Sequence, residues 1–272
     1  MAAYPVVSGP YGFKPVNLIG GQVFSGSTRN LPIQYNYGTA IYYGDFVKLT
    51  AGYVEILANT ISSNVAVGVF LGCYYTNPTT KNRQFSQYYP GNITAGDITA
   101  IICDDPDTIF RVAVTTTAGG STIGSASSIL VGQNMAGNTA TGNATSGNSN
   151  GAVVGASSST GNFRVMNLVP DTQISVSGTY VSGGAPAATS VVVSGLPVGA
   201  FLPIGTDVFN LVSGQLQFTG ATLSAASTVT TTGSTTLTVT AVTTQVAGTV
   251  ALVETPEVLV KITFGAHRYY VA

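Results

Sequence analysis

The chain has 272 residues, of which 7% are charged and 44% are hydrophobic, and its formal net charge is −1. Soluble domains carry about 25% charged residues, and so little charge is typical of a protein whose surface is covered in an assembly. The composition disfavours a nucleic-acid binder, which needs clustered Lys and Arg. It also disfavours a histidine-based zinc site, since there is one His, and a disordered chain.

The N-terminal residues predict neither a secretory signal nor a membrane anchor. They lack a basic segment followed by a long apolar run. The best candidate for a membrane span, residues 65–73, is about half the length that a span needs. We therefore expect no membrane partner.

Short runs that alternate between apolar and polar residues dominate the sequence, with Gly, Pro, Asn and Asp between them. Alternation with a period of two is typical of half-buried strands, as for Val258, Val260 and Ile262. No window has the apolar stripe of an amphipathic helix. We predict an all-β protein built on an antiparallel sandwich or barrel. The predicted strands are 41–49, 53–57, 65–75, 98–103, 109–114, 163–169, 174–181, 190–194, 207–212, 215–219, 228–232, 235–243, 249–253 and 257–264.

Charge divides the chain into domains. Residues 173–253 contain a single charged residue, Asp207, and Pro-containing junctions stand on both sides of this stretch. We predict that 173–253 is a small β-domain inserted near the end of a larger one, which comprises 1–172 and 254–272. Insertion is easiest at exposed loops whose ends lie close together.

Two segments of the larger domain lack a strand pattern. Residues 1–30 are rich in Gly, Pro and Tyr and are predicted to form an extended arm, with the opening of the β fold as the alternative. Residues 115–162 contain no charge and many Gly, Ser, Thr and Asn residues, which is typical of a long mobile or functional loop. The apolar residues Ile129, Leu130 and Val131 are expected to hold part of this loop in place.

Two motifs have chemical interpretations that the sequence does not favour. Gly147-Asn148-Ser149-Asn150-Gly151 matches the nucleophile pattern of hydrolases, but the flanking strand and helix that the pattern requires are absent. The run Asp104-Asp105-Pro106-Asp107 could supply calcium ligands, but a turn in which the carboxylates accept backbone N–H groups is favoured. We predict no enzyme activity, and no catalytic, cofactor-binding or metal-binding residue.

Basic and aromatic residues alternate over residues 81–90, a pattern that can bind single-stranded nucleic acid. With only two basic residues, packing within the fold or against a protein partner is favoured. Cys73 and Cys103 lie in apolar runs and are predicted to be buried free thiols, with a disulfide as the alternative.

Several motifs together resemble tailed-bacteriophage head decoration, or cement, proteins. The resemblance covers residues 1–114 and about the last twenty residues, but not 173–253. The motifs that carry it are Tyr11-Gly12-Phe13-Lys14-Pro15-Val16, Ile41-Tyr42-Tyr43-Gly44-Asp45-Phe46-Val47-Lys48-Leu49, Val67-Gly68-Val69-Phe70-Leu71-Gly72-Cys73-Tyr74-Tyr75, Ile102-Cys103-Asp104-Asp105-Pro106 and Val258-Leu259-Val260-Lys261-Ile262.

The resemblance implies a structural protein on the exterior of the virion that is assembled in the host cytoplasm. Its partners would be the major capsid protein and further copies of itself, in a dimer or trimer. The candidate contact residues are Tyr11, Phe13, Lys14 and Pro15, at the start of the chain. The alternatives are a phage tail, fibre or adhesin protein and, more remotely, the major capsid protein itself.

Overall fold

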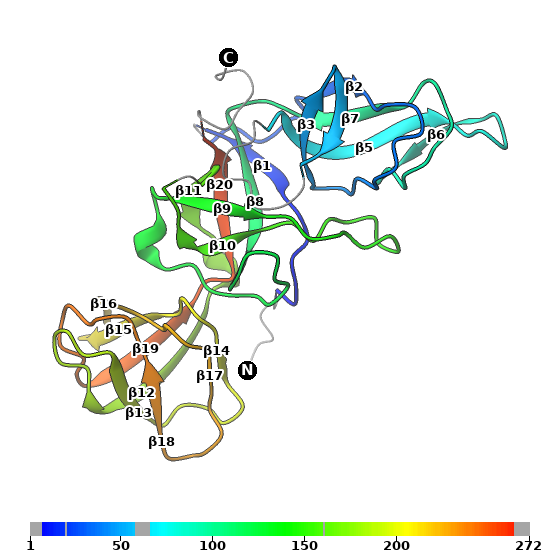
Figure 1. Ribbon diagram of the computed structural model, residues 1–272. Coiled ribbons are helices and arrows are strands. Elements are labelled where there is room, and N and C mark those ends of the chain that lie inside the picture. The colour runs from blue at the N-terminus through cyan, green and yellow to red at the C-terminus, as the bar shows by residue number, and fades with distance from the viewer. Residues whose placement is uncertain (1–6, 20, 58–65, 160, 264–272) are drawn as a thin grey trace.

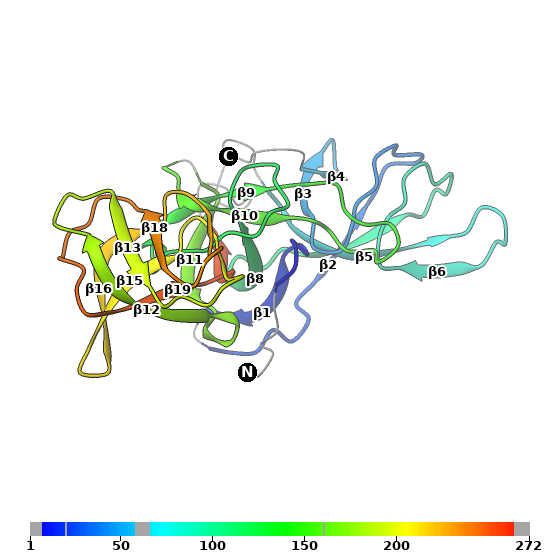
Figure 2. The same ribbon diagram turned by 90° about the horizontal axis from the view of Figure 1, so that it is seen from below.

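The computed structural model describes residues 7–19, 21–57, 66–159 and 161–263. It confirms the all-β class: the strands form several sheets whose pairing is mostly antiparallel, and the two helices of the described chain are single 3-10 turns. Three β-modules follow one another in a row, and both views in Figures 1 and 2 show this elongated arrangement. Among the described residues, no helix has the length and apolar character of a membrane span.

The N-terminal module is a curled sheet with strand order β2-β7-β5-β3-β4, and β6 pairs with β5. A bridge between Ile33 and Val54 brings the two ends of the sheet together. Its core contains Phe70, Ile102 and Tyr89. The strands are β2 (Arg29–Pro32), β3 (Phe46–Thr50), β4 (Tyr53–Ile56), β5 (Gly68–Thr76), β6 (Arg83–Ser86) and β7 (Thr99–Cys103).

The central module is a closed barrel, because β8 pairs with both β10 and β20 and thereby completes the ring β8-β10-β9-β11-β20. The β8–β10 pair is parallel, and the other pairs are antiparallel. β1 lies outside the ring on β8. Its elements are β1 (Lys14–Leu18), β8 (Thr108–Thr115), η1 (Ser128–Leu130), β9 (Asn134–Asn138), β10 (Ala152–Ser157), β11 (Phe163–Leu168), η2 (Pro170–Thr172) and β20 (Glu257–Ile262).

The inserted module has its own sheet, with order β16-β15-β19-β12-β13-β18, and its own apolar core. A bridge between Leu223 and Val239 joins the outer strands, so this sheet also curls on itself. Its strands are β12 (Ile174–Gly183), β13 (Ser190–Ser194), β14 (Phe201–Leu202), β15 (Asp207–Val212), β16 (Gln215–Thr222), β17 (Ser227–Thr228), β18 (Ser234–Thr238) and β19 (Thr249–Glu254).

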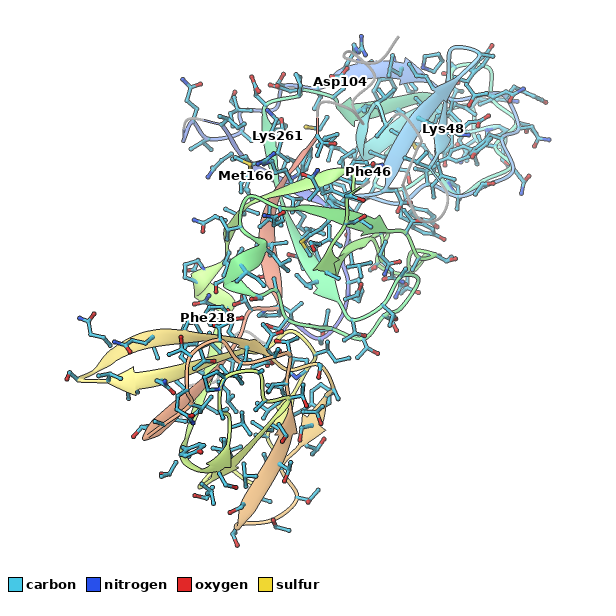
Figure 3. The ribbon with its side chains drawn as sticks, turned by 60° about the vertical axis from the view of Figure 1, so that its left-hand side comes forward. Phe46, Lys48, Asp104, Met166, Phe218 and Lys261 are labelled. Atoms are coloured by element: carbon cyan, nitrogen blue, oxygen red, sulfur yellow. The ribbon has the colours of Figure 1, made fainter. Side chains whose placement is uncertain are left out.

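An aromatic cluster joins the N-terminal module to the barrel. Phe46 lies where the two modules meet (Figure 3), and its ring centroid is 4.5 Å from that of Phe163 and 4.4 Å from that of Phe13. These rings belong to one core that also includes Phe110 of β8 and Val69 of β5. The larger domain expected over 1–172 and 254–272 thus consists of two sheets that share an apolar junction.

Residues 125–128 join the barrel to the inserted module. The Ser125 N–H donates to the Ile204 carbonyl at 3.0 Å, and the Ser128 N–H donates to Asp207 Oδ2 at 2.9 Å. Gly205 has φ +88°, and a Cβ at this position would lie 2.0 Å from the Ser125 carbonyl oxygen. Only glycine permits this close approach of the two backbones.

The structure differs from the sequence-based expectation in two segments of the larger domain. The stretch 115–162 is not a structureless loop, because β9, β10 and η1 lie within it and Leu130 is buried. Nor is 1–30 an extended arm throughout, since β1 and β2 are paired in sheets. Residues 1–6 lie outside the described residues.

Candidate interaction surfaces

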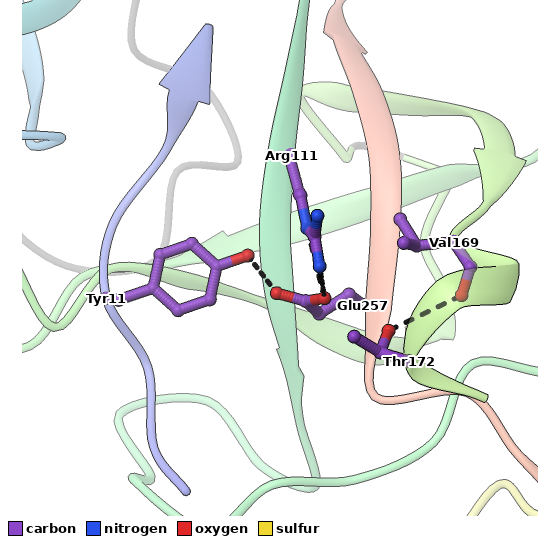
Figure 4. Close-up of polar contacts among 5 residues, drawn as sticks. All are labelled: Tyr11, Arg111, Val169, Thr172 and Glu257. Carbon is purple, nitrogen blue, oxygen red and sulfur yellow. Dashed lines mark hydrogen bonds and ion pairs between the residues drawn. The ribbon is translucent and has the colours of Figure 1, made fainter. Parts of the chain in front are cut away.

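A polar cluster fastens the N-terminal segment to the barrel (Figure 4). The buried carboxylate of Glu257, at the start of β20, accepts hydrogen bonds from the Tyr11 hydroxyl and from the Arg111 guanidinium, with Arg111 Nε 3.0 Å from Oε2. Burial alone would raise the pKa of Glu257, but the hydrogen bonds from Arg111 and Tyr11 hold it below its ordinary value. Lys14 Nζ lies 4.5 Å from the centroid of the Tyr11 ring.

The four predicted contact residues belong to the segment that this cluster fastens, but they differ in accessibility. Lys14 is exposed, whereas Tyr11 and Pro15 are half-buried. Phe13 is only 1% exposed because its ring stacks on Phe163 with centroids 4.8 Å apart. A side chain inside the aromatic core cannot reach a partner, so Phe13 does not belong to the contact set. Contact through Tyr11, Lys14 and Pro15 stays a prediction.

The hydrolase-like motif forms a joint between the N-terminal module and the barrel. Ser149 is 0% exposed; its Oγ donates to Asp45 Oδ1 and accepts the Gly151 N–H at 2.7 Å. Asp45 Oδ2 accepts the Tyr42 N–H at 2.7 Å. The serine hydroxyl therefore bridges two backbone loops. A catalytic triad would need a histidine, and the one histidine of the sequence, His267, lies outside the described residues.

Backbone contacts reinforce the same joint. The Gly12 N–H donates to the Gly151 carbonyl and the Phe13 N–H to the Gly44 carbonyl, each at 3.0 Å. A Cβ at Gly12 would lie 2.8 Å from Ser149 Cβ. Burial raises the pKa of Asp45 to about 6, although the hydrogen bonds from Ser149 and from the Tyr42 N–H act in the opposite direction.

The acidic run after β7 is a turn, as favoured from the sequence. The Asp107 N–H donates to Asp105 Oδ1 at 2.9 Å, the Asx-turn arrangement. Arg29 Nη2 lies 2.6 Å from Asp104 Oδ2, and Lys261 Nζ lies 3.0 Å from Asp107 Oδ1. Basic partners on β2 and β20 thus neutralise the carboxylates on either side of the turn.

Both cysteines are free and buried, as predicted. Burial raises the pKa of Cys73 to about 12 and that of Cys103 to about 11. Thiols with such pKa values are almost entirely protonated at neutral pH and behave as small apolar side chains.

Exposed large apolar side chains occur along the described chain, for example Val23 and Ile129 in the middle of the molecule, and the hairpins at its two ends carry some of them. At the end formed by the N-terminal module, the β5–β6 hairpin presents Phe85, which is 64% exposed. At the other end, the β15–β16 hairpin presents an insert tip of Leu211, Val212 and Leu216, of which Leu216 is 50% exposed. Figure 2 shows the two hairpins at opposite ends.

No known protein family, curated protein or solved structure matches the chain. Sequence reasoning had singled out residues 81–90, which include β6, but it missed the insert tip and the Glu257–Arg111 pair. The two residues of that pair are 146 positions apart, so only the pairing of β8 with β20 brings them together.

Proposed function

We propose that the protein is a virion structural protein that binds the outer surface of an icosahedral phage shell and stabilises it as a cement protein. Its partners are the major capsid protein and other copies of the same chain. The motif resemblance of residues 1–114 and of the C-terminal residues supports this function. All five motifs lie in the N-terminal module, β20 and the segment from Tyr11 into β1.

One observation carries the proposal: hairpins that bear exposed apolar side chains stand at both ends of a row of three β-modules. Figure 1 shows β6, which contains Phe85, toward one end and β16, which contains Leu216, toward the other. Exposed apolar side chains that lie next to one another, as Leu211, Val212 and Leu216 do, are typical of contact sites. A protein that joins neighbouring shell subunits needs contacts at separated points, and two weak contacts on one body give high avidity. The shared aromatic core at Phe46 and the close approach at Gly205 connect the intervening modules.

Cosedimentation tests the proposal. Purified protein is mixed with shells of the phage that encodes it, assembled without it, and bound protein is measured against concentration. We expect saturable binding at a simple ratio to the capsid subunit, and no further binding to shells that already carry the protein. Absence of binding, together with the protein on the tails of intact virions, would contradict the proposal and favour a tail or adhesin function.

A further inference from the structure

The β5–β6 hairpin projects from the N-terminal module, as Figures 1 and 2 both show. Its connecting turn has its own hydrogen bonds. Asn77 Oδ1 accepts the N–H groups of Thr79 and Thr80 at 2.9 and 3.1 Å, and the Asn77 N–H donates to the Asn82 carbonyl at 2.9 Å. These bonds define the shape of the turn, and at its base Thr76 Oγ1 donates to Asp97 Oδ2 at 2.6 Å, which ties the hairpin to the body of the module.

One face of the hairpin carries an ordered aromatic and basic surface. Phe85 is the register partner of Tyr74, and the Arg83 guanidinium carbon lies 4.6 Å from the centroid of the Tyr74 ring. Gly72 forms the seat for the exposed ring, because a Cβ there would lie 2.8 Å from two atoms of Phe85. The ring is thus positioned by the backbone beneath it and still presents most of its surface to solvent.

Hydrogen bonds between side chains on the opposite face link the two strands of the hairpin. Gln84 Nε2 donates to the Tyr75 hydroxyl at 2.8 Å, and Asn77 Nδ2 donates to Gln84 Oε1 at 3.2 Å. A surface whose side chains are already positioned loses little conformational entropy when it binds. Aromatic and Arg side chains in such a setting are the residue types that dominate binding energy at interfaces.

The charges on the hairpin indicate the chemistry of its partner. Arg29, Lys48, Arg111 and Lys261 form the ion pairs found among the described residues, and neither Lys81 nor Arg83 is within ion-pair distance of a carboxylate. Asp97, which is bonded to Thr76 at the base of the hairpin, is the acidic group that interacts with Arg83 at longer range. A partner with carboxylates at the rim of an apolar site would complement these two cations and the Phe85 ring. Two cations are too few for strong attraction to a phosphate backbone, so a protein is the better match.

Backbone groups add to this surface. β6 pairs with β5 and with no other described strand, so its second edge has N–H and C=O groups available to an added strand. Strand addition of this kind supplies affinity through the main chain, while neighbouring side chains give specificity.

We propose that Tyr74, Lys81, Arg83 and Phe85 form a hairpin face that docks on an acidic, apolar site of the shell protein. This inference rests on the proposed shell-binding function and assigns the docking element within it. The segment from Tyr11 into β1 belongs to the barrel, so the hairpin face is a separate contact from the predicted one around Tyr11 and Lys14.

Shell cosedimentation of matched variants tests the hairpin face. Phe85→Ser is compared with Tyr35→Ser, which removes another exposed aromatic side chain (59% exposed) from the same module. Truncating a dominant interface aromatic costs about 30-fold in affinity, so we expect a loss of 10-fold or more for Phe85→Ser and less than 2-fold for Tyr35→Ser. The double variant Lys81→Glu/Arg83→Glu should bind more weakly and lose the salt dependence of the wild-type protein.

Hydrogen exchange provides a second readout that does not depend on variants. Amides of residues 77–86 should exchange more slowly when the wild-type protein is bound to shells. If Phe85→Ser and Lys81→Glu/Arg83→Glu bind shells with wild-type affinity, and exchange over 77–86 does not change on binding, the hairpin face is not the docking element. The proposed shell-binding function would still stand in that case. Failure of the wild-type protein to bind shells would overturn both proposals, and binding to a single-stranded DNA oligonucleotide instead would assign the face to nucleic acid.

Discussion

Asp45 lies at the joint between the N-terminal module and the barrel, and its protonation is linked to the stability of that joint. Burial in the folded state raises the pKa of Asp45 to about 6, so the Asp45 carboxylate binds a proton more tightly in the folded state than in the unfolded state. The stabilisation from this group is complete below about pH 4 and is lost as the pH rises through about 6.

We predict that Asp45→Asn removes this pH dependence. Relative to the variant, the wild-type free energy of unfolding should fall by about 2.5 kcal/mol between pH 4 and pH 7.5. Urea unfolding at several pH values measures the difference. Burial also raises the pKa of Glu254, to about 7, so this group adds its own pH dependence to the free energy of unfolding of both proteins. The contribution of Asp45 is therefore the difference between the wild-type protein and Asp45→Asn at each pH. Identical slopes for the two proteins would contradict the role of Asp45.

Phe13 and Lys14 are neighbours in sequence with opposite environments, one buried in the aromatic core and the other exposed. Phe13→Ala should lower the free energy of unfolding by about 3–5 kcal/mol, the usual cost of emptying an aromatic site in a core. Lys14→Ala should change it by less than about 0.5 kcal/mol. Chemical denaturation measures both, and equal effects would contradict the assignment of Phe13 to the core.

At the scale of elements, strand prediction succeeded where bulky β-branched and apolar residues alternate. β8, β11, β12, β13, β15 and β20 lie close to their predicted bounds. β9 was missed because Asn134–Asn138 contains Met135 as its one large apolar residue. Its place in the barrel comes from pairing on both edges, which a local pattern does not reveal. Conversely, 228–232 is rich in Thr and Val, yet only Ser227–Thr228 pairs there, with β14.

A buried asparagine fixes the end of β9. Asn138 Nδ2 donates to the Gly120 carbonyl at 2.9 Å and to Thr115 Oγ1 at 3.2 Å, and Asn138 Oδ1 accepts the Gly119 N–H at 2.6 Å. The side chain thereby satisfies polar groups of the turn that follows β8.

We predict that Asn138→Ala destabilises the barrel by about 1–3 kcal/mol, because it leaves these buried groups without partners. The exposed Asn167 of β11 provides the control, and Asn167→Ala should have little effect. Thermal unfolding followed by circular dichroism measures both variants. An unchanged midpoint for Asn138→Ala would contradict this role.

At the scale of the whole molecule, the inserted module begins and ends at the same place. Ile174 and Glu254 are register partners in β12 and β19, so the two ends are ~5 Å apart. On the barrel side, Leu168 pairs with Val258 between β11 and β20. The sequence indicated this insertion through its near-absence of charge. It did not reveal that the larger domain consists of two modules joined by an aromatic core, because Phe46 and Phe163 of that core meet only in the folded chain.

We predict that the barrel and the N-terminal module still fold when 174–254 is replaced by a short Gly-Ser linker. The contacts of Ser125 and Ser128 with the insert would be lost, so the midpoint of thermal unfolding should fall while the transition stays cooperative. Calorimetry measures the transition. Loss of folded structure in the shortened chain would contradict the independence of the barrel core.

Electron cryo-microscopy of intact virions tests the proposed function most directly. Under the proposed function, virions of the phage that would encode this chain are imaged with the wild-type protein and again without it. We predict a difference density on the outer face of the shell, with the shape of three β-modules in a row and with the β5–β6 hairpin against a capsid subunit. Density on the tail, or none on the shell, would contradict a cement function.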